Sequence, residues 1–491
     1  MTGYPRRLVG KPLSAASLSL AAALSVLWFL SGCLPAVSDD PENRIGAADL
    51  AMSRQAYAEI VEKFPVYAGP VIPQLVQSVG ERLTARVSIP ANSKLVFEVL
   101  DSPGVFAHSF AHGRIVISRG LVTLFNTEAQ LAAVLAHEIG HVVALHPSRY
   151  LREARNMREL EARLAARMGR QEGRDALRVM GLARVRGYSR EHELEADDWS
   201  ERLLERAGYD VGATTQALRL LLQVQVFHEK LGFELWDLPE SGSGGGVFAT
   251  HPSLEHRLAQ ARARQGRAAL NPAKADPSYL RALQDMPYGL PERMGIQYGR
   301  EYVHPAARVT FTLPPKWYLF SVRDQLIAAP RGQDGLLMIR FASPEAGESR
   351  RQALDRLAGG YTLETVVTRT PTTVMAAGWK QDGTDRRQAR FAIVDAGTKR
   401  LQVAGFAYLP GNWAEADARF QELINSIRTL PEGKHLRARA PRVKVADSVM
   451  LVTHVPGAKL YGEPPAERWQ LLNQLFPDQR LPAGHPAKIL E

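Results

Sequence analysis

Cysteine is almost absent from this sequence, since Cys33 is the only one in 491 residues. A chain with a single cysteine forms no internal disulfide, so its fold must be stabilised by a hydrophobic core and by any metal that it binds. Hydrophobic residues make up 45% of the sequence and charged residues 23%, as in an ordinary soluble globular protein. At about 100–200 residues per domain, this length predicts about two to four domains.

Long apolar runs, repeats and blocks of like charge are also missing. Beyond the N-terminal segment no apolar run suits a multi-span membrane domain, and only SGSGGG at 241–246 is of low complexity. The formal net charge is +10, but the basic residues are scattered among acidic ones and form no arm or stripe. We therefore expect no nucleic-acid partner; the alternative that the charge allows is an acidic envelope surface or polymer.

The first 33 residues have the pattern of a bacterial lipoprotein signal. MTGYPRRLVGK is a basic n-region, LSAASLSLAAALSVLWFL is an apolar h-region, and LSGC, which ends at Cys33, resembles a lipobox. The resemblance implies cleavage before Cys33 and acylation of its thiol, and each buried CH₂ of an acyl chain contributes about 0.8 kcal/mol to anchoring. Leu34 in place of aspartate implies sorting to the outer membrane, facing the periplasm. The alternative is an uncleaved anchor helix with a chance cysteine.

Three ionisable residues stand inside VLAHEIGH (134–141), a stretch that otherwise has the pattern of a buried helix. Burying such groups costs several kcal/mol unless they are paired or bind a metal. A T-x-x-Q capping box at 127–130 opens the helix, and His137 and His141 lie about 40° apart on one face. That spacing suits one tetrahedral zinc, with Glu138 able to reach a water at the open position. The alternative is two core histidines beside an unrelated glutamate, and a third ligand would decide.

His146 lies about 140° from His141 around a continuing helix, so it cannot be that third ligand. The metzincin pattern is excluded as well, because it needs glycine at 144 and histidine at 147, where this chain has Ala144 and Pro147. The third ligand must therefore come from another segment of the chain.

A second helix is predicted over 190–207, within YSREHELEADDWSERLLERAGYD, with Gly208 as its stop. Glu193 and Asp197 share one face, so Glu193 can complete a His₂Glu site and Asp197 can accept a hydrogen bond from a ligand histidine. Glu195 lies about 200° around the helix from Glu193, which predicts a solvated side chain. The alternative is an exposed glutamate-rich helix with no ligand.

Together these motifs resemble peptidase family M48, in particular its HtpX and BepA branch of zinc metalloproteases; the family also holds the CAAX prenyl proteases. HEIGH is followed by E-x-x-A-D in the second helix, RIVISRGLV resembles the edge strand and its turn, and ATHPSLEHRL (249–258) resembles T-H-P-x-x-x-x-R-[IL]. The resemblance covers roughly 45–290. In one departure, AHSFAHGR replaces N-A-F-A-x-P, which puts His108, His112 and Arg114 near the expected substrate cleft.

The resemblance implies one Zn²⁺ ion held by His137, His141 and Glu193, with Glu138 as general base. It also implies an α+β fold in which a mainly helical zincin-type domain, 34–290, carries a small edge sheet. Protein or peptide substrates would pair, as extended strands, with the exposed edge strand formed by Ile115, Val116, Ile117 and Ser118.

Arg257 and His251 are the candidates for stabilising the oxyanion, from their family positions and their chemistry. For Arg257 the alternative is an arginine on a helix surface. His251 follows the SGSGGG loop and precedes Pro252, so its alternative role is a cap on the zinc that holds the enzyme latent.

The pattern changes after about Pro291. RVTFTLPPKWYLF, LLMIRFA and the hairpin RFAIVDAGTKRLQVAGFAY have strand patterns, and WAEADARFQELINSIRTL is an amphipathic helix. We therefore predict an α+β accessory domain over 295–430, interpreted as a stability or spacer module.

Residues 436–491 resemble a degenerate LysM module, with Leu472 and Asn473 as its leucine–asparagine pair. Such modules bind peptidoglycan; the alternative is a packing appendage.

Two functions follow from these predictions. The first is a membrane-anchored periplasmic zinc metalloendopeptidase that hydrolyses misfolded or misassembled envelope proteins. The second is a latent, metal-bound assembly factor or chaperone for outer-membrane or cell-wall components. Proteolysis needs Glu138, whereas a binding role needs only the fold, and the position of Glu138 beside the ligands favours the enzyme.

Overall fold

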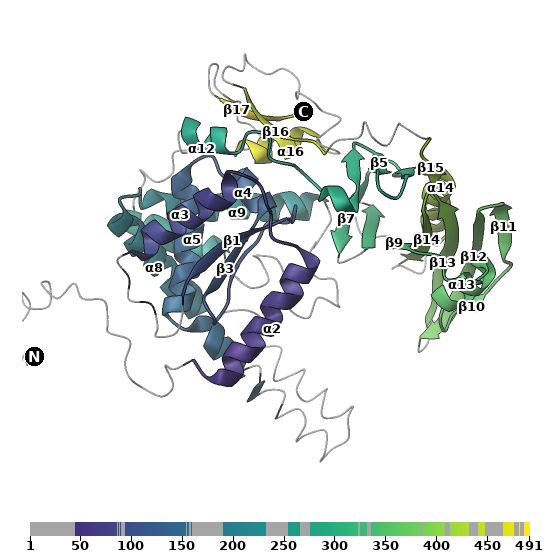
Figure 1. The fold of residues 1–491 in the computed structure, drawn as a ribbon, viewed down its shortest axis with the longest axis horizontal. Helices are drawn as coiled ribbons and strands as arrows, with labels where there is room; N and C mark the ends of the chain where they lie inside the picture. Colours follow the sequence, from purple (N-terminus) through teal and green to yellow (C-terminus); the bar gives the residue numbers. More distant parts are fainter. Residues whose placement is uncertain are drawn as a thin grey trace, which may run out of the picture. The chain divides into compact units, whose positions relative to one another are not determined.

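The computed structural model describes residues 45–491 except 86, 88, 90–93, 154, 157–158, 160–189, 232–253, 266–274, 323–324, 331–334, 383–384, 408–412, 432–439, 447–464, 476–480 and 482–485. Cys33 with its signal segment, and His251, lie outside the described residues. The described part mixes helices and sheets, so the predicted α+β class is confirmed (Figure 1). Among the helices of this part, none is both long and apolar enough to cross a membrane.

Residues 45–290 are mainly helical, with one small sheet (Figure 1). The helix α5 is at their centre, because it packs against α3, α8 and α9 and against strand β2. The helices are α2 (Ala47–Lys63), α3 (Ile72–Thr84), α4 (Arg119–Leu124), α5 (Glu128–Val143), α8 (Arg190–Ala207), α9 (Gly212–Leu231), α11 (Leu254–Gln265) and α12 (Pro277–Ala282), and the strands are β1 (Val96–Leu100), β2 (Ala107–Ser109) and β3 (Arg114–Ser118).

The helix α5 begins where the sequence predicts and packs very closely on α8. Thr127 is its N-cap, and the Thr127 side chain accepts a hydrogen bond from the backbone N–H of Gln130. Gly140 makes the close approach to α8 feasible, because a Cβ at this position would lie 2.7 Å from Cβ of Trp199. This small residue therefore sets the distance between the two helices that carry the predicted ligands.

The end of α5 differs from the prediction. The helix stops at Val143, since Leu145 takes a left-handed conformation with φ of 58°. A new helical turn begins at His146, just before Pro147. Proline is favoured in the first turn of a helix, where its missing N–H costs nothing. His146 is thereby removed from the continuing helix on which the sequence analysis places it.

The second predicted helix is confirmed as α8, with the expected bounds. Gly208 ends it in a left-handed conformation, φ 77°, and its N–H donates to the carbonyl of Glu205. Glu193 and Asp197 are fully buried on the side of α8 that packs against α5.

The small sheet has the order β1–β3–β2, with β1 parallel and β2 antiparallel to β3. Ile115, Val116, Ile117 and Ser118 therefore lie in the central strand, and the prediction that they form an exposed edge is wrong. Both sides of β3 already carry ladder hydrogen bonds, so a substrate strand cannot add there. The error arises because β2 has only three residues, Ala-His-Ser, which give no strand signal.

The strands β1 and β2 form the two edges of this sheet, and none of the described strands pairs with the outer side of β2. Residues 65–67 run along the outer side of β1 at its end, where Tyr67 N donates to Val99 O and Asp101 N donates to Pro65 O. The strand β2, in contrast, lies against α5.

Residues 296–429 are built on a long antiparallel sheet of order β10-β12-β13-β14-β9-β8-β7, with β11 paired to β12, and on a smaller sheet of order β15-β6-β5-β4. The predicted hairpin turn joins β13 to β14. Alternate residues of β12 and β13 belong to different cores, so α13 packs on one face of the long sheet and α14 on the other. The elements are β4 (Ile296–Tyr298), β5 (Glu301–His304), β6 (Val309–Thr312), β7 (Trp317–Val322), β8 (Gln325–Pro330), β9 (Gly335–Ala342), α13 (Arg350–Leu357), β10 (Thr362–Leu363), β11 (Val367–Thr370), β12 (Thr373–Asp382), β13 (Asp385–Ala396), β14 (Lys399–Ala407), α14 (Trp413–Ser426) and β15 (Arg428–Thr429).

The C-terminal tail contains an antiparallel pair of strands, with a helix between them in sequence. Asn473, at the end of that helix, ties it to the second strand: its side chain accepts from Lys488 N and donates to Lys488 O. The elements are β16 (Val443–Ala446), α16 (Pro465–Leu472) and β17 (Ala487–Leu490).

The tail is attached to the segment that leads into α5. Lys488 is 1% exposed, and its Nζ donates to the carbonyl oxygens of residues 123, 124 and 125 at 2.8, 3.1 and 3.0 Å. Gln474 forms a reciprocal amide pair with Gln130 in the first turn of α5. The start of the helix that carries two predicted ligands is thus held by the C-terminal end of the described chain.

Candidate metal centre

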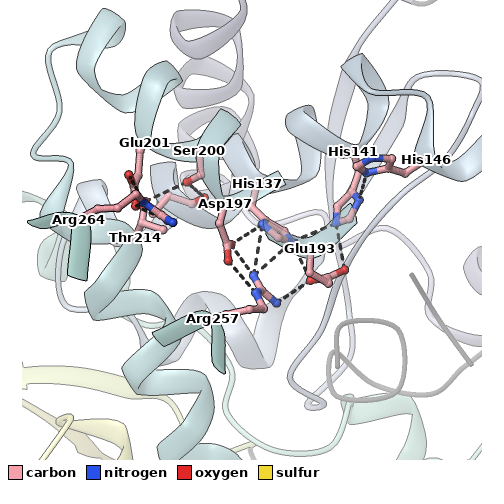
Figure 2. A network of polar contacts seen from close by, with 11 residues as sticks. His137, His141, His146, Glu193, Asp197, Ser200, Glu201, Thr214, Arg257 and Arg264 are labelled. Carbon is pink, nitrogen blue, oxygen red and sulfur yellow. Dashed lines mark hydrogen bonds and ion pairs between the residues drawn. The ribbon is translucent and has the colours of Figure 1, made fainter. Parts of the chain in front are cut away.

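Three buried side chains from two helices converge on one point (Figure 2). His137 and His141 project from α5, and their Nε2 atoms are 3.0 Å apart. Glu193 projects from α8, with Oε2 3.5 Å from Nε2 of His137 and Oε1 3.4 Å from Nε2 of His141. The structure therefore brings together the three ligands that the sequence predicts.

The donor set fits zinc in number, type and spacing. A tetrahedral zinc holds nitrogen and oxygen ligands at about 2.0–2.2 Å, which separates neighbouring donor atoms by about 3.2–3.6 Å. The observed separations of 3.0, 3.5 and 3.4 Å lie close to that range. Three protein ligands leave a fourth position for water or substrate, as in catalytic rather than structural zinc sites.

Asp197 and Arg257 support two of these ligands. Oδ1 of Asp197 is 2.9 Å from Nδ1 of His137, on the ring edge opposite Nε2. Arg257, from α11, donates to Asp197 through Nε at 2.8 Å and through Nη2 at 2.6 Å, and its Nη1 is 2.6 Å from Oε2 of Glu193. Arg257 is 3% exposed, so the alternative of a surface arginine is excluded.

The opposite charges in this network stabilise each other's charged form. Burial and the Arg257 guanidinium act to lower the pKa of His137, but the Asp197 and Glu193 carboxylates outweigh them and raise it to about 9. Burial acts to raise the pKa of Asp197, and Arg257 and His137 hold it below its usual value. A ligand histidine must be neutral, so zinc that binds here displaces the proton of His137.

Glu138 follows His137 in α5 and is 2% exposed. Burial acts to lower the pKa of Arg257, but the carboxylates of Asp197 and Glu193 raise it. The Glu138 carboxylate lies near enough to add a smaller effect in the same direction. A buried carboxylate next to the donor set is suited to take a proton from a reacting water.

Two of the residues in AHSFAHGR that depart from the N-A-F-A-x-P pattern, His112 and Arg114, fasten α2 to the small sheet. His112 Nδ1 lies 2.8 Å from Oγ of Ser53 in α2. Arg114 pairs with Glu98 at 2.7 Å, and the hydroxyl of Tyr57 in α2 donates to the same carboxylate at 2.6 Å. These contacts assign His112 and Arg114 to the packing of α2.

Sequence reasoning missed one neighbour of the ligands. His146 is fully buried, and its Nδ1 lies 2.8 Å from Nδ1 of His141. Its exclusion as a metal ligand assumed a continuing helix, whereas Pro147 was the available signal that a new helix begins there. Glu195, which we expected to be solvated, has a side chain 49% exposed and lies 3.2 Å from Nε2 of His146.

Residues 73–265 match Peptidase family M48. The chain carries an M48 peptidase domain. M48 peptidases are zinc enzymes, and His137, His141 and Glu193 of this domain are positioned to hold the ion.

Three relatives illustrate the similarity. The beta-barrel assembly-enhancing protease of Yersinia pestis is 24% identical over 280 residues, 54% of this chain and 55% of that protein. The protein of the same name from Escherichia coli (strain K12) is 29% identical over 210 residues, 41% of this chain and 40% of that protein. Mitochondrial metalloendopeptidase OMA1 of Arabidopsis thaliana is 31% identical over 167 residues, 33% of this chain and 30% of that protein. This chain thus spans about half the length of the bacterial relatives.

Proposed function

We propose that this protein is a zinc metalloendopeptidase that hydrolyses peptide bonds of misfolded or misassembled envelope proteins. The observation that supports it most is the convergence of His137, His141 and Glu193 beside the buried Glu138. A site that only stores metal does not need a carboxylate next to a ligand histidine, whereas hydrolysis needs a proton acceptor at that position.

The residues divide the chemistry between them. Zinc at this site supplies a Lewis acid for the scissile carbonyl and acidifies water. Glu138 takes the proton of the attacking water and passes it to the leaving amine. Asp197 accepts the Nδ1–H of His137, which leaves Nε2 of that ring to face the metal.

Arg257 holds the carboxylates of Asp197 and Glu193, because its guanidinium contacts both. In this proposal Arg257 therefore positions the metal ligand Glu193. Oxyanion stabilisation by Arg257 and His251, and the capping role of His251, are predictions that come from the sequence.

Substrate strands add, in this proposal, to the outer edge of β2. Ser118 N donates to Phe106 O, and Phe110 N donates to Arg114 O, so alternate residues of β2 face β3. By the same alternation the backbone groups of Ala107 and Ser109 point to the outer edge. Both residues are buried in this structure, at 3% and 0% exposure, so a peptide can pair with them only after the part of the chain that covers them moves away. An extended peptide bound there would be gripped by main-chain hydrogen bonds, with little sequence preference, as clearance of misfolded proteins requires.

The variant Ser109→Pro tests this substrate edge, because it removes one outward N–H, with Ser109→Ala as the matched control that keeps it. One hydrogen bond contributes about 0.5–1.5 kcal/mol, so KM for a peptide should rise roughly two- to tenfold in the proline variant. Zinc content should stay unchanged in both. An unchanged KM in Ser109→Pro would contradict strand addition at β2.

The place of action is proposed from the sequence and from the relatives. The lipobox at Cys33 would anchor the protein to the outer membrane by acyl chains, facing the periplasm. The LysM-like tail would give peptidoglycan as a further partner. The name of the bacterial relatives, beta-barrel assembly-enhancing protease, supports an envelope role. Loss of peptidoglycan pulldown on deletion from Ala440, in a protein that keeps its zinc, would support the tail's role, and unchanged pulldown would dismiss it.

Metal removal tests the proposed activity. A chelator should abolish casein cleavage, and one equivalent of zinc should restore it. The alternative function, a latent metal-bound assembly factor or chaperone, predicts zinc binding without cleavage under any of these conditions.

A further inference from the structure

The two ligand histidines are supported differently. His137 meets the Asp197 carboxylate directly at Nδ1, 2.9 Å away. His141 meets another imidazole at the same ring position, since its Nδ1 lies 2.8 Å from Nδ1 of His146 (Figure 2). The second contact does not by itself say which ring carries the proton, because an imidazole can donate or accept.

The contacts of the Nε2 atom in each ring decide the direction. Nε2 of His141 is directed at the ligand set, so in a metal-binding ring Nδ1 carries the hydrogen. His141 therefore donates and Nδ1 of His146 accepts. The hydrogen of His146 is then on Nε2, where the Oε2 atom of Glu195 lies 3.2 Å away and accepts it. The chain of donors runs from His141 through His146 to Glu195 with one consistent set of tautomers.

The surroundings of His146 keep this chain in place. His146 is fully buried, and the ring of His192 stacks on it at a centroid distance of 4.2 Å and an angle of 26°. The left-handed Leu145 brings His146 back against α5, and Glu195 and His192 both come from α8. The ligand helix α8 therefore supplies Glu195 and His192, and the turn that follows α5 supplies His146.

We propose that His146 and Glu195 are positioning residues for the metal ligand His141: together they fix the tautomer and ring orientation that present its Nε2 to zinc. Asp197 does this for His137 in one step, and the pair His146–Glu195 does it for His141 in two. This role rests on the proposed zinc site but not on peptide hydrolysis. Partners of this kind typically change metal affinity by about 10- to 100-fold.

Zinc affinity, measured by competition with a chromophoric chelator, tests the role of His146. His146→Leu removes the acceptor that faces Nδ1 of His141 and should weaken zinc binding about 10- to 100-fold. His146→Asn places an amide oxygen near the same position and should recover most of the affinity. The visible spectrum of the cobalt-substituted protein should change in the leucine variant and return toward wild type in the asparagine variant.

Glu195 gives a second test that does not depend on a buried substitution. Glu195→Ala should weaken zinc binding several-fold, whereas Glu205→Ala, at an exposed position of the same helix, should leave it unchanged. If His146→Leu fails to fold, this pair of variants decides alone. Equal losses in His146→Leu and His146→Asn, or a Glu195→Ala variant that binds zinc like Glu205→Ala, would overturn the positioning role. Zinc binding by the wild type without proteolysis would contradict the proposed function and leave this role intact.

Discussion

Removal of Arg257 should destabilise the site even when no substrate is present. The guanidinium is 3% exposed and makes contacts of 2.6–2.8 Å with Asp197 and Glu193. In Arg257→Gln these two buried carboxylates lose their arginine, and breaking a buried pair in this way costs about 3–5 kcal/mol. If Arg257 acted only on the oxyanion, the same substitution would change catalysis and leave stability unaltered.

Hydrogen exchange of peptides from α5 and α8 is the suitable assay, because it reads local unfolding free energy in a chain of several domains. With each 1.36 kcal/mol equal to a factor of ten, exchange in the chelator-treated variant should be roughly 150- to 5,000-fold faster. Arg264→Gln is the matched control: it removes an arginine of α11 whose partner is Glu201 of α8 in a partly exposed pair. Such pairs contribute about 0–1 kcal/mol. Equal exchange rates in the two variants would refute the reasoning.

Two further substitutions test the packing around α5. Gly140→Ala places a methyl group 2.7 Å from Cβ of Trp199, so despite alanine's better helix propensity it should cost about 1–3 kcal/mol and weaken zinc binding; a stabilised variant in thermal melts would contradict this. Lys488→Met removes the donor to carbonyl oxygens 123–125 and should cost about 1–3 kcal/mol, measured as faster exchange at the start of α5. Lys444→Met, at a partly exposed ion pair of the same tail, is its control and should change stability by at most about 1 kcal/mol.

The ligand set was accessible from the sequence because it depends on local periodicity. Two histidines four apart, and a carboxylate on a capped second helix, follow from 3.6 residues per turn. The bounds of α8 were also predictable, because Gly208 follows its last residue and glycine readily takes the left-handed conformation that ends a helix. What these patterns could not give is how close the two helices lie, which depends on the contact of Gly140 with Trp199.

The errors arose where structure depends on a few residues or on distant segments. The sheet order could not be read from the sequence, since β2 is three residues long and carries no alternation. The break at Leu145 redirects His146 toward His141, and a helical wheel cannot show this. The attachment of Lys488 to residues 123–125 joins parts of the chain more than 360 residues apart, which no local pattern records.

The central claim is that VLAHEIGH forms a hydrolytic zinc site with Glu138 as its base. The most direct test is zinc content and casein cleavage, measured side by side for the wild type and Glu138→Gln. We predict one zinc per chain in both proteins, with cleavage in the wild type and loss of cleavage in the variant. Cleavage that persists in Glu138→Gln, or a wild type that binds no zinc, would contradict the account.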